Sequence, residues 1–235
     1  MHPTLTPDQM HLSVDGLIFT VRQKELVVLL AQRTNPPHAG QWALPGRLVG
    51  LSESADEAMQ ALLAEMLPGT ATYSEQLYTF TAPHRDARGR VVTVAHLVLL
   101  PWEQLAQHTH SPLKCFTIWH EPDGIRLLAE DGTTLSPADL AFDHGHVLTT
   151  GIARLQGKID YTDVAFHLLQ DMLAFSLSEL QAVFEAVLHQ QLDASNFRRG
   201  ILGKYEATGR LTQTAQAKKQ GRGRPAALYQ FQPQK

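Results

Sequence analysis

The chain has 235 residues, 43% of them hydrophobic, and a net charge of −3, values that fit one large or two modest soluble domains. Its single cysteine, Cys115, excludes an internal disulfide and a cysteine-based zinc cluster, and it indicates a reducing compartment. The amino terminus has no signal-like pattern and no apolar run approaches the roughly 20 residues that span a bilayer, so we expect a cytoplasmic protein.

The first part of the chain alternates short apolar runs with turns. Apolar residues recur at helical spacing from Ser54 to about Leu67, which predicts one helix. Strand character occurs in six runs, at residues 12–21, 25–31, 75–82, 91–100, 115–119 and 125–129. This mixture predicts an α/β domain and excludes an all-helical one.

A second helix is expected where this domain ends. Ser136 and Pro137 suit an N-cap followed by proline in the first helical turn. Apolar residues near helical spacing extend this predicted helix to about Leu155. We place the domain boundary within it, which divides the chain into residues 1–150 and residues 151–235.

The last third of the chain has the pattern of a helix-turn-helix unit followed by a β-hairpin. Ser176 and Glu179 have capping-box spacing, and an apolar stripe at helical spacing follows them. Asp193 or Ser195 then caps a second helix, which turns Phe197, Ile201 and Tyr205 inward. Strand character returns on both sides of a cationic, glycine-rich stretch near residues 215–225, as in the wing of a winged helix.

Positive charge gathers in this unit. Residues 1–149 hold nine Lys and Arg against sixteen Asp and Glu, whereas the chain from Arg198 onward has nine basic residues and one acid, Glu206. This asymmetry indicates a nucleic-acid-binding end on an acidic body, and a two-fold DNA site predicts a homodimer. The alternative is a protein-interaction module with a solvated basic hairpin. The predicted DNA-binding residues are Asn196, Arg198, Arg199, Lys204, Lys218, Lys219, Arg222 and Arg224.

Residues 42–69 resemble the Nudix box, G-x5-E-x7-R-E-U-x-E-E-x-G-U with U a bulky aliphatic residue, preceded by W-x-L-P-G. The glutamates of that box hold divalent cations against a diphosphate, because Mg²⁺ prefers oxygen ligands. Here the first Glu falls on Glu53 and Glu65 is kept, but Leu62 and Met66 replace two of the three helix glutamates. We therefore expect no Nudix hydrolysis, no catalytic residue and no bound metal.

Three further segments, LLAQRTNPPHAGQWALPG, EQLYTF and HRDARGRVV, resemble in the same order those of the Nudix-related transcriptional regulators of NAD metabolism. The resemblance extends from about residue 11 to residue 231. It implies an α+β fold, in which a Nudix-like α/β/α sandwich domain precedes a C-terminal winged helix-turn-helix domain. In that family Arg198 and Arg199 would belong to the recognition helix.

The resemblance also implies a repressor that binds double-stranded operator DNA and senses ADP-ribose or a related nucleotide, with no cofactor. Such a ligand needs cationic groups for its phosphates and a flat apolar slot for its base. Arg47 stands where the Nudix box has glycine, and it either adds a phosphate contact or blocks the site. The predicted ligand-binding residues are Arg33, Trp42, Arg47, Arg85, Asp86, Arg88 and Arg90.

Alternatives to this interpretation stay open. The chain could be an active ADP-ribose or nucleotide-sugar pyrophosphatase, a Nudix-fold regulator that senses a sugar such as arabinose, or a constitutive DNA-binding protein with a vestigial sensor. Twelve histidines are present and include the pairs His108-x-His110 and His144-x-His146. No third ligand lies beside either pair in the sequence, so no metal site is predicted.

Overall fold

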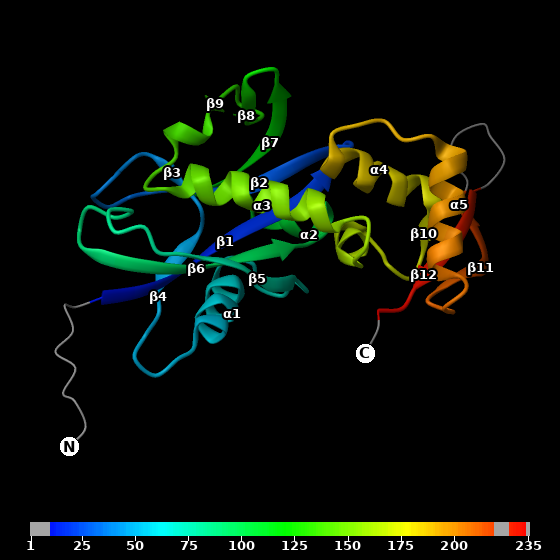
Figure 1. Cartoon of the computed structure of the whole chain (residues 1–235), viewed down its shortest axis with the longest axis horizontal. Coiled ribbons are helices and arrows are strands. Elements are labelled where there is room, and N and C mark those ends of the chain that lie inside the picture. Colours follow the sequence, from blue (N-terminus) through cyan, green and yellow to red (C-terminus); the bar gives the residue numbers. More distant parts are fainter. Residues whose placement is uncertain (1–9, 219–225, 234–235) are drawn as a thin grey trace.

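The computed structural model describes the backbone of residues 10–218 and 226–233, and their side chains except those of residues 216–218. A large sheet with helices on both faces forms one end of the molecule, and two helices with a small sheet form the other (Figure 1). None of the helices in the described ranges has the length and apolar character that crossing a membrane requires.

The large sheet contains nine of the described strands, in the order β5-β6-β1-β2-β7-β8-β9, with β3 paired to β2 and β4 paired to β1. β1 and β6 run parallel and the other pairs are antiparallel. The strands are β1 (Met10–Arg22), β2 (Glu25–Gln32), β3 (Trp42–Ala43), β4 (Gly46–Leu48), β5 (Tyr73–Phe80), β6 (Arg90–Leu99), β7 (Leu113–Glu121), β8 (Gly124–Leu128) and β9 (Thr134–Leu135).

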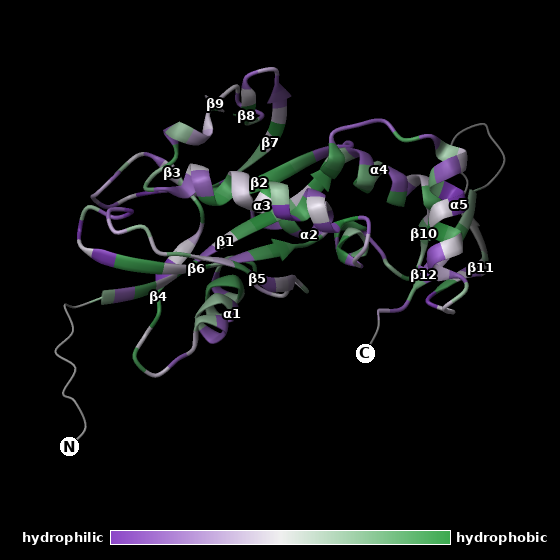
Figure 2. Cartoon of the chain, viewed as in Figure 1, coloured by the Kyte–Doolittle hydropathy of each residue, from purple (hydrophilic) through white to green (hydrophobic). Residues whose placement is uncertain are grey.

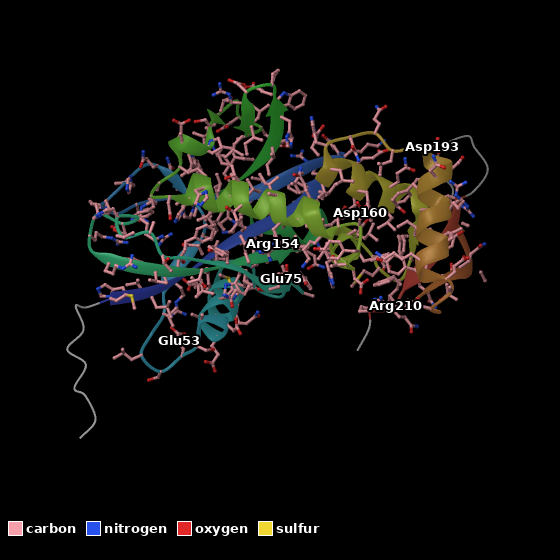
Figure 3. All side chains as sticks on the ribbon, in the orientation of Figure 1. Glu53, Glu75, Arg154, Asp160, Asp193 and Arg210 are labelled. Atoms are coloured by element: carbon pink, nitrogen blue, oxygen red, sulfur yellow. The ribbon has the colours of Figure 1, made fainter. Side chains whose placement is uncertain are left out.

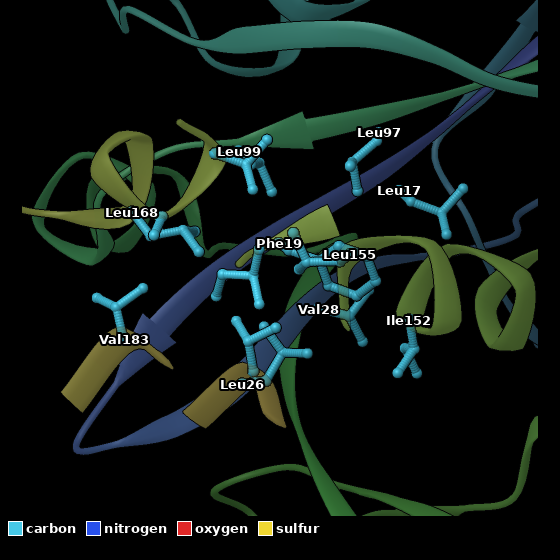
Figure 4. Packing of buried hydrophobic residues seen from close by; sticks show 14 of the residues in the cluster. Leu17, Phe19, Leu26, Val28, Leu97, Leu99, Ile152, Leu155, Leu168 and Val183 are labelled. Atoms are coloured by element: carbon cyan, nitrogen blue, oxygen red, sulfur yellow. The ribbon is translucent and has the colours of Figure 1, made fainter. Parts of the chain in front are cut away.

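The apolar side chains of β1 contribute to an apolar layer on each face of the large sheet, because successive side chains of a strand point to opposite faces. Leu17 and Phe19 pack against α3 (His144–Lys158), and Val14 and Ile18 pack against α1 (Ala55–Met66). Figure 4 shows the first layer, and Figure 2 shows how strongly apolar the centres of β1 and β2 are. The predicted α/β/α sandwich is confirmed.

Helix α1 forms where the sequence predicts it. The side chain of Ser54 accepts a hydrogen bond from the backbone N–H of Glu57, and the Glu57 carboxylate accepts one from the backbone N–H of Ser54. This capping box satisfies backbone groups that the helix itself leaves unpaired. Shorter helical segments follow later in the domain, at α2 (Trp102–Leu105), η1 (Ala106–His108) and η2 (Pro137–Asp139).

The helix predicted from Pro137 to Leu155 is wrong in its first part. Ser136 caps only the short 3₁₀ turn η2, after which Leu140 is extended and Phe142 adopts a φ of 56°. The break allows Leu140 and Ala141 to be buried, and the Ala141 N–H donates to the carbonyl of Trp42 at 2.8 Å. The α-helix, α3, therefore begins at His144 and runs past residue 150, so the domain boundary stays a prediction.

The C-terminal unit contains the two helices and the following two strands in the predicted order, preceded by two short elements that the sequence did not predict, η3 (Val164–Leu168) and β10 (Phe175–Ser176). The predicted elements are α4 (Leu177–Leu188), α5 (Ala194–Tyr205), β11 (Leu211–Lys218) and β12 (Ala226–Phe231). The Ser176–Glu179 capping box is present, and Asp193 caps α5 by accepting from the N–H of Asn196 at 2.8 Å. A three-stranded sheet, β10-β12-β11, completes a winged helix.

The two ends of the molecule share one apolar core. Val183 and Phe184 of α4 belong to the same cluster as Leu26 of β2 and Leu155 of α3 (Figure 4). The side-chain amide of Gln156 donates to a carbonyl of α4 at 3.0 Å. Helix α3 is thus packed against the large sheet along its length and joined to α4 near its end.

Candidate ligand pocket and DNA interface

A charged cavity of about 180 Å³ opens beside β1, β4 and the start of α3. Five of the seven predicted ligand-binding residues line it: Arg33, Arg47, Arg85, Asp86 and Arg88. They reach it from three segments, the loop after β2, the strand β4 and the loop between β5 and β6. The structure adds Asp15, Phe142 and His144, which sequence reasoning did not assign to a ligand site.

Arg85 lies at the base of this cavity, with 4% of its side chain exposed. Its Nε and Nη2 atoms donate to the two carboxylate oxygens of Asp143 at 3.0 and 2.6 Å. Its Nη2 also lies 3.5 Å from Oδ2 of Asp15. Because Asp143 occupies the N-cap position of α3, Arg85 fixes the start of that helix to the cavity.

Asp15 and His144 are buried beside Arg85. The Nδ1 atom of His144 accepts from the backbone N–H of Leu44 at 2.9 Å, which places the ring proton on Nε2, 3.6 Å from Oδ1 of Asp15. Burial lowers the pKa of His144 and keeps the ring neutral. Oδ2 of Asp15 accepts no hydrogen bond from the described residues, so this carboxylate is held by electrostatic attraction alone at that oxygen.

The close approach of β4 to β1 beside Asp15 requires glycine at position 46. A Cβ atom at this position would lie 2.2 Å from Oδ1 of Asp15 and 2.7 Å from the carbonyl oxygen of Val14. The glycine of the Trp-x-Leu-Pro-Gly segment therefore lets β4 approach β1 closely enough to form one wall of the cavity.

Three more arginines surround the opening. Nη2 of Arg47 donates to Oε1 of Glu53 at 2.9 Å, and Glu53 lies in the loop before α1 (Figure 3). Arg88 donates to both oxygens of Asp86, and these hydrogen bonds hold the pKa of Asp86 below its usual value. Arg33 has a lowered pKa, mainly because it is partly buried. The rim is thus cationic, although two of its arginines share their charge with a carboxylate.

Phe142 provides an aromatic surface at this rim. The guanidinium of Arg33 lies 4.6 Å from its ring centre and that of Arg88 lies 5.5 Å from it. An aromatic residue with positive φ is rare, and such strained backbone is found mainly at functional sites. No sequence pattern predicts the positive φ of Phe142, because it depends on the packing of Leu140 and Ala141.

Trp42 and Arg90 do not line this cavity. The Trp42 ring packs edge-on against Phe116 with their centres 5.1 Å apart, and it lines a separate cavity of about 400 Å³ together with Trp102. The side chain of Arg90 turns back, and its Nη1 donates to the carbonyl of Thr81 at 2.7 Å.

Helix α1, which lies within the segment that resembles the Nudix box, contains apolar side chains where the Nudix pattern has glutamates. Leu62 is 7% exposed and packs in the same layer as Met59 and Leu63, with Met66 half-buried against it. Glu65 is exposed. Within the described part of the chain, no three His, Cys, Asp or Glu side chains gather in a group that would hold a metal ion.

The basic residues of α5 lie around the helix in three directions. Asn196 and Arg199 are exposed, and Nη2 of Arg199 donates to Oδ1 of Asn196 at 2.8 Å. Nη2 of Arg198 donates to the hydroxyl of Tyr229 in β12 at 3.1 Å. Nζ of Lys204 donates to the carbonyl of Asp160 at 2.7 Å, and partial burial lowers the pKa of Lys204.

The other predicted DNA-binding residues belong to the hairpin. Lys218 is the last residue of β11, and its side chain is not among those described. Lys219, Arg222 and Arg224 lie outside the described residues. For these positions the contact with DNA stays a prediction.

Comparison with known proteins decides the family. Residues 165–231 match the model of the NrtR DNA-binding winged helix domain. The ADPR responsive transcriptional repressor NtrR of Acinetobacter baylyi is 34% identical over 223 residues, which cover 94% of this chain and 81% of that protein. The chain belongs to the NrtR family.

A solved structure and a second curated protein extend this comparison. NrtR of Shewanella oneidensis, crystallised with a 27mer DNA, is similar with a TM-score of 0.74 and 31% identity over 94% of this chain and 93% of that one. The ADP-ribose pyrophosphatase of Methanocaldococcus jannaschii is 31% identical over 86 residues, 37% of this chain and 48% of that enzyme. The NrtR matches cover both ends of the molecule, so the predicted Nudix-like domain followed by a winged helix is confirmed.

Proposed function

We propose that this NrtR-family protein is a transcriptional repressor that binds operator DNA through its winged helix and senses ADP-ribose in its Nudix-like domain. The observation that carries the proposal is the presence in one chain of two cationic sites of different kinds. One is the open cavity with Arg33, Arg47 and Arg88, and the other is the exposed face of α5 with Asn196 and Arg199.

The cavity suits the diphosphate of such a ligand. Guanidinium groups bind phosphate oxygens through paired N–H donors, and three of them converge on this opening. A volume of about 180 Å³ encloses only part of a nucleotide, because complete sites for ligands of that size measure about 300–1,000 Å³. We place the phosphates among the arginines and the ribose or base over the rim, where Phe142 offers a flat surface.

We also propose that the domain has lost Nudix hydrolysis. The Nudix box implies a divalent cation, but the donor set does not fit one, because Leu62 and Met66 contribute to the apolar layer where carboxylates would be needed. Glu53 already accepts from Arg47 at 2.9 Å, and the positive guanidinium repels a cation at that carboxylate. Binding of the ligand is then separated from its cleavage.

An active pyrophosphatase is the second candidate, and the similarity to the Methanocaldococcus jannaschii enzyme over 86 residues favours it. ADP-ribose incubated with Mg²⁺ or Mn²⁺ separates the two. We expect no AMP above the level of an E65Q variant. Cleavage that exceeds this control would replace the sensor proposal with the enzyme.

Helix α3 provides a physical path between the two sites. Its N-cap residue, Asp143, is bound to Arg85 at the cavity, and Gln156 near its other end bonds to α4. Lys158 in its last turn also forms a partly buried salt bridge with Glu75 of β5, at 2.5 Å. A ligand that prefers one position of α3 would thereby change the position of the winged helix, by no more than its differential affinity allows.

We further propose that the repressor acts as a homodimer in the cytoplasm. A dimer places two recognition helices on successive turns of one DNA face, which matches the two-fold symmetry of a palindromic operator.

Electrophoretic mobility shift with DNA from upstream of the protein's own gene tests the proposal. We expect a shifted band at moderate salt that disappears as ADP-ribose is added, with arabinose as the control ligand. Release by arabinose alone would identify a sugar sensor, and a band indifferent to both would indicate a vestigial sensor. Absence of any shift would contradict DNA binding itself.

A further inference from the structure

The cations of α5 are separated by the geometry of the helix. Each residue turns about 100° from the one before it, so neighbours in the sequence occupy different faces. Ile201 and Tyr205 mark the buried face, at 6% and 2% exposure. Arg199 is turned farthest from that face, whereas Arg198 and Lys204 lie on opposite flanks, beside β12 and beside Asp160.

The partner of Arg198 is fixed in place. Tyr229 is 1% exposed and lies in β12, the central strand of the small sheet, paired with Phe175 of β10 and Gln213 of β11. Its hydroxyl accepts from Nη2 of Arg198 at 3.1 Å. The hydrogen bond therefore ties the first half of α5 to the strand that leads out of the wing.

The partner of Arg199 lies on the same helix. Oδ1 of Asn196 accepts from Nη2 of Arg199 at 2.8 Å, and both side chains are exposed. The bond orients the guanidinium along the helix surface and leaves its other N–H groups unpaired by described residues, in the arrangement that reads two acceptors on a guanine edge.

We propose that Arg198 is a positioning residue that holds the recognition helix against the wing strand, and that Arg199, oriented by Asn196, is the residue that determines base specificity. The inference rests on the proposed DNA-binding function. It assigns placement of the helix and recognition of a base to two adjacent arginines. Phosphate contacts and helix placement act on every DNA sequence alike, whereas a base contact acts only on the preferred one.

The experiment uses the full-length protein and a duplex that the wild type selects from a randomised library. Fluorescence anisotropy gives Kd for the selected duplex and for a scrambled duplex, and the ratio of the two measures specificity. The variants are Y229F, R198A, R198K, the double variant R198A/Y229F, and R199A. Thermal unfolding confirms that each variant is folded at the temperature of the binding assay.

We expect Y229F to weaken binding about three- to tenfold on both duplexes, the range of one hydrogen bond, and to leave the ratio unchanged. R198A and the double variant should bind equally, because the second change removes a bond that the first has already broken. R198K should remain weak on both duplexes, since an ammonium lacks the planar fork of the guanidinium. R199A should lower the ratio by about tenfold or more.

Two results would overturn the inference while leaving DNA binding intact. One is a Y229F protein that binds like the wild type while R198A lowers the specificity ratio as R199A does, which would make Arg198 a base-reading residue. The other is full recovery of affinity in R198K, which would reduce the role of Arg198 to its charge. A wild type that selects no sequence would contradict the proposed function itself, and the inference with it.

Discussion

The charged cavity and the surface of α5 use arginine in opposite ways. In the cavity Arg85 is paired with Asp143, Arg88 with Asp86 and Arg47 with Glu53. On α5 none of the three basic side chains forms a salt bridge with a described residue, and their partners are a hydroxyl, an amide and a carbonyl.

This difference follows from what each site has to do. Carboxylate partners fix three of the four cavity arginines before a ligand arrives, whereas Arg33 donates to backbone carbonyls. These pairs lower the entropy lost on binding but also lower the net charge that the ligand meets. Uncharged partners orient the α5 residues without neutralising their charge, which remains available to the DNA. Loss of the buried cavity arginine, Arg85, should therefore affect folding first, whereas changes on α5 should affect DNA affinity with little loss of stability.

The largest effect on stability is expected from R85A. Removing this side chain leaves the buried Asp15 and the half-buried Asp143 without their shared cation, and breaking a buried pair in this way costs about 3–5 kcal/mol. Urea unfolding measures the change. R47A is the matched control, because the side chains of Arg47 and its partner Glu53 are 37% and 22% exposed, so its loss should cost less than about 1 kcal/mol. Equal losses in both variants would contradict the distinction between buried and rim arginines.

The next effect concerns Gly46. G46A should lower the free energy of unfolding by about 1–3 kcal/mol, because the added methyl group overlaps Asp15 and the carbonyl of Val14. G157A supplies the control. Gly157 lies exposed in α3 with nothing within 4 Å of an added Cβ, so alanine there should stabilise the protein by about 0.5–1 kcal/mol. If G46A were as stable as wild type, β4 would not approach β1 as closely as described.

A smaller effect should appear as a pH dependence of stability. His144 has a lowered pKa in the folded protein, whereas the unfolded chain takes up a proton near its ordinary value of about 6.5. The contribution of neutral His144 to the free energy of unfolding is therefore complete above about pH 6.5. It is lost as the pH falls from there toward the pKa of His144 in the folded protein. H144N keeps an acceptor for the N–H of Leu44 but cannot titrate.

Urea unfolding from pH 8 to pH 5 tests this dependence. The wild type should lose more stability than H144N over that interval, although the burial of His120 and His167 lowers their pKa values too and leaves H144N with part of the slope. Parallel curves for the two proteins would show that His144 is not held neutral.

The smallest effect on folding is expected from R47A. Arg47 is 37% exposed in its side chain, so its loss should change the free energy of unfolding by less than about 1 kcal/mol. Calorimetry should nevertheless show ADP-ribose binding about tenfold more weakly, because a charge-assisted phosphate contact is removed. Tighter binding by R47A would mean that this arginine blocks the cavity instead of serving it.

Local patterns predicted most of the fold. The strands β1, β2, β5, β6, β7 and β8, the helices α1, α4 and α5, and the capping box at Ser176 lie where spacing and turn chemistry predict them. These signals are local, because the residues that form a cap or an apolar stripe lie only a few positions apart in the sequence. The start of α3 differs from the prediction because burial of Leu140 and Ala141 outweighs the cap at Ser136.

The candidate site was predictable only in part. The arginines carry charge and could be identified one by one, but Asp15 and His144 meet across 129 positions of sequence and no local pattern pairs them. Trp42 is predicted to bind the ligand because an aromatic ring can stack on its base, whereas its place in β3 directs the ring toward Phe116, so its contact with the ligand stays a prediction. The face of the sheet to which a side chain points depends on the register of strand pairing, which cannot be read from a single sequence.

The central claim is that the cavity and α5 are coupled, and linkage tests it directly. Calorimetry measures the affinity of ADP-ribose for the free protein and for the protein saturated with its selected operator. If ADP-ribose releases the operator, it must bind the DNA-bound protein more weakly, by the same factor by which it weakens DNA binding, and coupling of this kind typically amounts to about 5- to 150-fold. Equal affinities in the two states would contradict the account.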